Sequence, residues 1–79
     1  MKRYLVVVEG GQNGENYSAY SPDVDGCVAA GETMDEVLNL MYEALQLHLG
    51  AMARDGEELP EESISAVYMA IPEPKLEAA

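Results

Sequence analysis

The sequence predicts an α+β domain in which three strands precede one long helix and a fourth strand follows it, in the order β-β-β-α-β. Two observations lead to this prediction. Before residue 32, short runs rich in apolar and β-branched residues alternate with clusters of Gly, Asn, Asp and Pro, a pattern typical of strands joined by turns. Over residues 34–54 the apolar positions instead recur every three or four residues, which is typical of an amphipathic helix.

The first part of the chain is predicted to form an antiparallel meander. Because the run RYLVVVE at residues 3–9 is apolar at successive positions, we expect a strand covered on both faces and central in the sheet. The glycine-rich stretch 9–16 and the strand-like residues 17–21 complete a β-hairpin. Pro, Asp and Gly supply turn chemistry at 22–26, and a short third strand is expected over 27–30, broken by a glycine.

The helix has clear signals at both ends. Thr33 followed by Glu36 matches the capping box, and Gly56 is a good left-handed stop after an expected last turn at Arg54 or Asp55. The expected stripe consists of Met34, Val37, Leu38, Met41, Ala44, Leu45, His48 and Met52. The helix carries more apolar surface than one sheet face can cover, and we expect Leu40, Leu47 and His48 to contribute to a subunit interface.

The last predicted strand follows an acidic, proline-containing loop at residues 56–63. It is the run ISAVYMAI at 64–71, and Pro72 ends it. Because a helix separates it from the third strand, it can pair in parallel with an earlier strand through a right-handed crossover. We therefore expect one domain over residues 1–71, with the helix packed on one face of the sheet, and a loose tail over 72–79.

Composition limits the classes of function. A chain of 79 residues has room for one small core, so we expect a homo-oligomer, a dimer or a tetramer. Fifteen acidic against four basic residues give a net charge of −11, which opposes direct binding of nucleic acid. The single cysteine and the lack of a signal-like or membrane-spanning apolar stretch lead us to expect a cytoplasmic protein that does not contact a membrane.

A longer stretch resembles a known family. The segment YSAYSPDVDGCVAAGETMDEVLNLMYEAL, followed by DGEELP, is similar to the HicB antitoxins of bacterial and archaeal toxin–antitoxin pairs, over about residues 4–71. The resemblance rests on the order of Tyr20, Pro22, Asp23, Gly26, Cys27, Gly31, Thr33, Glu36 and Ala44, with Gly56 and Pro60 as a second block. It implies a truncated ribonuclease-H-like fold, in agreement with the predicted element order. It also implies a task, the neutralisation of HicA, a small basic ribonuclease with a double-stranded-RNA-binding fold and a catalytic histidine.

Catalytic and metal chemistry have little support in the sequence. Two-metal hydrolysis requires converging carboxylates, in this fold including one on the first strand, yet residues 4–8 and 64–71 contain none, so we expect neither an enzyme nor a cofactor. Asp23 and Asp25 offer too few oxygens for calcium and are expected to bond turn amides or, by the resemblance, to pair with basic toxin residues. Cys27 is expected to be a small buried residue.

The expected function is therefore that of an antitoxin-like protein that occludes a HicA-type toxin, to which opposite charge steers it. The candidate contact residues are Tyr20, Asp23, Asp25, Glu57, Glu58, Glu61 and Glu62. Many HicB proteins carry a further C-terminal DNA-binding segment, and here only about eight residues follow the last predicted strand, so operator binding is expected only through another chain. The alternative is an orphan homo-oligomeric HicB-like domain that binds another protein or a small ligand.

Overall fold

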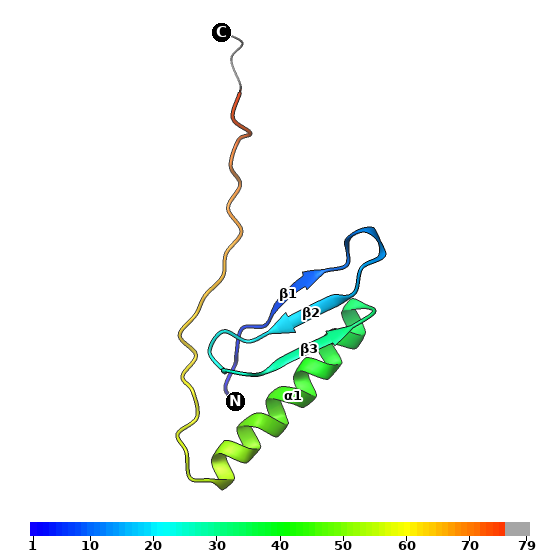
Figure 1. Ribbon diagram of the computed structural model, residues 1–79. Coiled ribbons are helices and arrows are strands. Elements are labelled where there is room, and N and C mark those ends of the chain that lie inside the picture. The colour runs from blue at the N-terminus through cyan, green and yellow to red at the C-terminus, as the bar shows by residue number, and fades with distance from the viewer. Residues whose placement is uncertain (76–79) are drawn as a thin grey trace.

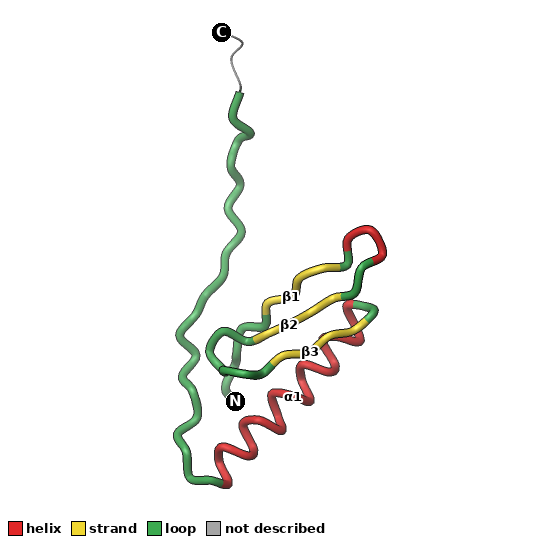
Figure 2. Tube along the Cα trace, viewed as in Figure 1, coloured by secondary structure: helices red, strands yellow, loops and turns green. Residues whose placement is uncertain are grey.

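The computed structural model describes residues 1–75 as a three-stranded antiparallel sheet, one long helix across one face of that sheet, and an extended C-terminal segment (Figures 1 and 2). Residues 76–79, the end of the tail predicted over 72–79, lie outside the described residues. Strands β1 (Val7–Gly10), β2 (Tyr17–Tyr20) and β3 (Val28–Gly31) follow one another in the sheet in sequence order. The sheet is the predicted meander, with Val7 opposite Tyr20 and Tyr17 opposite Gly31.

The position of β1 differs from the prediction. The first strand was expected to be central, whereas β1 pairs with β2 alone and lies at an edge of the sheet (Figure 1). Residues 4–8 are half-buried rather than covered on both faces. Tyr4, Val6 and Val8 pack against the core, so alternate residues of this run face the helix and the remaining ones face outward.

The turn after β2 contributes to the core. Residues 21–27 are closed by backbone bonds, in which the Val24 amide donates to the Ser21 carbonyl at 3.2 Å and the Cys27 amide donates to the Val24 carbonyl at 3.3 Å. This geometry turns Val24 and Cys27 inward, with exposed fractions of 1% and 3%. The core they complete consists of Ala19, Val24, Cys27, Val37 and Met41. The segment is a structural connector as well as a surface loop.

Helix α1 (Met34–Arg54) lies across β3 and β2 and has the predicted ends. Thr33 is the N-cap, and its Oγ1 accepts a bond from the Glu36 amide at 3.1 Å. At the other end Gly56 adopts a left-handed φ of 74°, and the Glu57 amide donates to the Met52 carbonyl at 2.9 Å. Gly31, expected to break the third strand, is instead its last residue. A Cβ there would lie 3.0 Å from the Val37 amide nitrogen, so glycine allows the helix to start close to the sheet.

The predicted fourth strand does not form in the single chain. Residues 64–71 are extended but pair with no strand, and they project from the body to give extents of 63 × 29 × 20 Å (Figure 1). The reason is the path of the chain before them. Contacts of Pro60 and Ser63 with the body fix where the segment starts, and a hollow of about 390 Å³ then separates residues 66–68 from residues 5–8.

No helix within residues 1–75 combines the length and the apolarity that crossing a bilayer would require.

Candidate interaction site

The turn after β2 and the segment after α1 meet beside the N-terminal residues of the chain. Asp23 in the turn accepts two hydrogen bonds from Ser63, with the Ser63 amide 2.9 Å from Oδ2 and the Ser63 hydroxyl 2.6 Å from Oδ1. Both carboxylate oxygens are therefore engaged by one residue that lies 40 positions away in sequence. This pair of bonds fastens the start of the C-terminal segment to the body.

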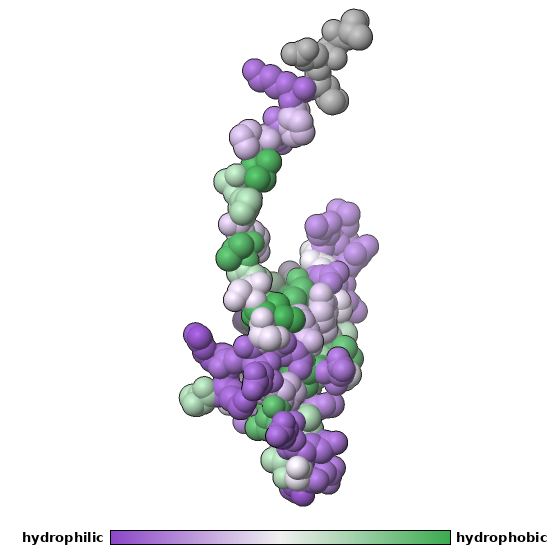
Figure 3. Space-filling view, turned by 90° about the vertical axis from the view of Figure 1, so that its left-hand side faces the viewer, coloured by the Kyte–Doolittle hydropathy of each residue, from purple (hydrophilic) through white to green (hydrophobic). Residues whose placement is uncertain are grey.

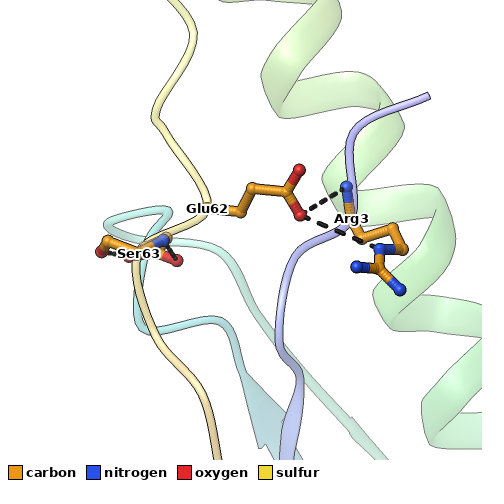
Figure 4. Close-up of polar contacts among 4 residues, drawn as sticks. Arg3, Glu62 and Ser63 are labelled. Atoms are coloured by element: carbon orange, nitrogen blue, oxygen red, sulfur yellow. Dashed lines mark hydrogen bonds and ion pairs between the residues drawn. The ribbon is translucent and has the colours of Figure 1, made fainter.

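The N-terminal residues hold the same segment from its other side. The Tyr4 hydroxyl donates to the Pro60 carbonyl at 2.5 Å, and the Lys2 ammonium lies 3.5 Å from the same oxygen. The Arg3 amide donates to Glu62 Oε2 at 3.3 Å, and the Arg3 guanidinium lies 4.0 Å from that oxygen (Figure 4). Because the Arg3 side chain is 92% exposed, the ion pair contributes little, and the partly buried Tyr4 bond is the firmer contact.

Negative charge is concentrated in the two segments that form this junction. Asp25 in the turn is exposed, as are three carboxylates of the following segment, Glu57, Glu58 and Glu61. Arg3 and Glu62 form the one ion pair found among residues 1–75. We name the set Asp25, Glu57, Glu58, Glu61 and Glu62 the acidic cluster. In a chain of net charge −11 such a surface attracts cationic partners and repels phosphate.

Two titratable groups near the junction have shifted pKa values. The hydrogen bonds from the Ser63 hydroxyl and amide lower the pKa of Asp23 below its ordinary value of 3.8, because they stabilise the ionised carboxylate. Burial raises the pKa of the Cys27 thiol, since the apolar core disfavours the thiolate. Asp23 is thus an ionised acceptor at neutral pH, and Cys27 is a protonated core residue.

No group of three or more His, Cys, Asp or Glu side chains in the described part of the chain is placed to hold a metal ion. Cys27 has apolar neighbours in the core, and His48 is half-buried on α1. The carboxylates at the junction can accept hydrogen bonds and attract cations.

A second surface lies beside the junction and is apolar. Tyr4 and Val6 from the N-terminal run and Leu38, Tyr42 and Leu45 from α1 line a hollow of about 440 Å³. Met41 forms part of its wall, and Leu49 lies at the next turn of the helix. We name this hollow the apolar groove. The groove runs along the part of α1 that no strand covers. It is left open because α1 packs on β3 and β2 and not on β1.

Comparison with known proteins identifies the family. Residues 4–77 match the family model described as the HicB-like antitoxin of bacterial toxin–antitoxin systems. The chain belongs to this family. The family is one of toxin–antitoxin components, which indicates a regulatory and non-catalytic role in general.

Three curated relatives are similar to this chain, and the two UPF0150 proteins among them are consistent with the family. An uncharacterized 14.9 kDa protein of Haemophilus phage HP1 is 38% identical over 61 residues, which are 77% of this chain and 46% of the phage protein. A UPF0150 protein of Helicobacter pylori is 39% identical over 49 residues, 62% of this chain and 65% of that protein. A UPF0150 protein of Synechocystis is 28% identical over 61 residues, 77% of this chain and 76% of that protein. The HicB-like chain thus spans about half the length of the phage relative and just under two thirds of the Helicobacter one.

The predicted site residues of this HicB-like chain fall into separate groups. The structure brings Asp23 and Glu62 to the junction, with Asp25 exposed on the same turn. Tyr20 is 41% exposed on β2, while Tyr17 packs against the core, so one tyrosine of that strand remains available for a partner. Leu40 and Leu47 are exposed on α1, whereas His48 is half-buried.

Sequence reasoning missed the residues that join the chain's two ends. Ser63, Pro60 and Tyr4 make the junction, yet a lone serine before an apolar run carries no recognisable signal. The excess of carboxylates over 57–62 was visible, but the fact that the β2–β3 turn lies beside them was not, because that proximity depends on a contact across 40 residues.

Proposed function

We propose that this HicB-like chain is an antitoxin that binds a small basic HicA-type ribonuclease in the cytoplasm and occludes its RNA-binding face. Family membership supports the toxin–antitoxin role, and the observation that carries the finer proposal is the acidic cluster, in which every carboxylate except that of Glu62 forms no ion pair within residues 1–75. A ribonuclease must present cations to the RNA backbone, so an acidic cover competes for the same surface.

The mechanism that we propose is steering followed by exclusion. The charge of −11 accelerates the encounter with a cationic protein, and the exposed carboxylates then pair with its Lys and Arg side chains. Tyr20 and Asp25 contribute a contact from the sheet side, and Glu57, Glu58 and Glu61 contribute one from the segment side. Asp23 acts indirectly, because Ser63 occupies both of its oxygens and so keeps the segment in place. The chain performs no catalytic step.

We propose further that the domain, residues 1–71, is ribonuclease-H-like when its sheet is complete. The order β1-β2-β3 with α1 on one face matches the first four elements of that fold, and residues 64–71 would supply the fourth strand at the β1 edge.

Co-expression tests the proposal in cells. A neighbouring reading frame that encodes a small basic protein should arrest growth when it is induced alone, and the present chain should restore growth. A chain that rescues no neighbouring frame, and with which no basic protein co-purifies, would instead be an orphan domain with another protein or a small ligand as its partner.

Matched charge variants test the acidic cluster itself. Replacing Glu57, Glu58 and Glu61 with Gln should weaken toxin binding about tenfold, at roughly 0.5 kcal/mol for each exposed charge pair. The control replaces Glu9, Glu15 and Glu32 with Gln, since these three are also exposed and change the net charge equally. Equal weakening by both triple variants would show that net charge alone, and not this cluster, is recognised.

A further inference from the structure

One edge of the sheet is left free. Within residues 1–75 the outer edge of β1 pairs with no strand, so its amides and carbonyls are available to an added strand. The run that leads into it, residues 4–8, has no charged residue. Glu9 is the one charged residue of β1 itself, so most of this unpaired edge is apolar, and such an edge is a template for strand addition.

The same chain contains an extended segment that is suited to pair with this edge but pairs with no strand. We name residues 64–71 the arm. It is extended and uncharged, and no hydrogen bond joins residues 65–75 to the rest of the described chain. Val67 is 83% exposed, and Tyr68, Met69 and Ile71 are also exposed. Figure 3 shows hydrophobic residues, in green, exposed along the segment that projects above the body. Exposed apolar surface on this scale favours burial in an interface.

The arm and the edge do not meet within one chain. The bonds to Pro60 and Ser63 fix where the arm starts, and from there the arm diverges from β1 (Figure 1). Residues 66–68 and 5–8 line opposite sides of a hollow of about 390 Å³ instead of forming a ladder. Beside that edge lies the apolar groove, about 440 Å³, lined by Tyr4 and Val6 together with helix residues. Side chains of an added strand that point towards α1 would enter this groove.

We propose that two copies of the chain exchange arms, so that residues 64–71 of each add as a strand to the β1 edge of the other and fill its apolar groove. Each copy offers one arm and one edge, so a two-fold arrangement satisfies both at once. The distribution of charge favours a second copy of this chain over a basic protein as the partner at this edge. A basic partner is drawn to the acidic cluster, whereas residues 4–8 and 64–71 are uncharged, so two acidic copies can pair there without bringing carboxylates together.

Photo-crosslinking tests the exchange directly. The full chain carrying p-benzoylphenylalanine in place of Tyr68 is prepared in light and nitrogen-15 forms, which are mixed, refolded together and irradiated. The expected result is a covalent dimer whose cross-linked peptides join a heavy chain to a light one at residues 4–9. The same probe in place of Val28, on the opposite edge strand, is the control and should give no such product. Cross-links confined to single chains would show that the arm closes on its own edge and would overturn the proposal.

Sedimentation equilibrium supplies the second test. Val67→Asp should raise the dissociation constant of the dimer at least about tenfold, because it places a charge within each added strand. Val28→Asp, at an exposed valine on β3, should leave the constant unchanged. A wild-type chain that stays monomeric, or a dimer that both variants or neither variant disrupts, would refute arm exchange.

Discussion

Val24 offers a sharp test of the view that the turn after β2 is a structural connector. Its side chain is 1% exposed, whereas Val28, four residues later, is 66% exposed on β3. Val24→Ala removes two buried methyl groups at about 0.8 kcal/mol each, and the cavity left behind raises the loss to roughly 2–3 kcal/mol. That is a large share of the roughly 4–12 kcal/mol expected for a chain of this length.

The assay is urea denaturation followed by circular dichroism, at one fixed protein concentration because self-association adds to the apparent stability. Val24→Ala should lower the midpoint with an unchanged slope and lower the melting temperature by roughly 10–20 °C. Val28→Ala removes the same two methyl groups from an exposed site and should cost less than about 0.5 kcal/mol. Equal losses in the two variants would refute the assignment of Val24 to the core.

Three further predictions concern the groups that fix the site. The hydrogen bonds from Ser63 lower the pKa of Asp23 in the folded protein. Their contribution to stability is therefore complete above pH 3.8, the ordinary pKa of the group, and is lost as the pH falls through the pKa of Asp23 in the folded protein. Ser63→Ala should therefore move the NMR titration of the Asp23 carboxyl back towards 3.8, and an unmoved titration would contradict the contact. Cys27 should react with a thiol reagent at least about a hundredfold faster in denaturant than in the native protein, because burial shields it and raises its pKa; similar rates would place the thiol at the surface. Thr33→Ala should cost about 1 kcal/mol in urea denaturation while Thr33→Ser costs much less, and equal losses would argue against the cap.

The helix was predictable because its signals are local. Thr33, the three-to-four-residue apolar spacing and Gly56 all act within a few turns of the chain, and the observed helix ends at the expected residues. The turns at 9–16 and 22–26 were predictable for the same reason, since Gly, Pro and Asp determine backbone geometry where they stand.

The site was less predictable because it depends on contacts between distant segments. Nothing in the local pattern around Val24 distinguishes it from an exposed turn residue, yet it enters the core. The bond from Ser63 to Asp23 spans 40 residues, and it helps to determine where the arm leaves the body. The apolar run at 64–71 predicted a fourth strand, and that prediction is wrong for the single chain, because a strand requires an edge to pair with and the chain does not bring this run and the β1 edge together.

Occlusion of a basic ribonuclease is tested most directly by titration calorimetry of the full chain against the product of the neighbouring toxin frame, with RNA cleavage measured in the same mixtures. We predict saturable binding that weakens as salt rises, together with loss of RNA cleavage in proportion to the toxin bound. The absence of binding heat at low ionic strength, with RNA cleavage undiminished by an excess of the chain, would contradict the proposed function.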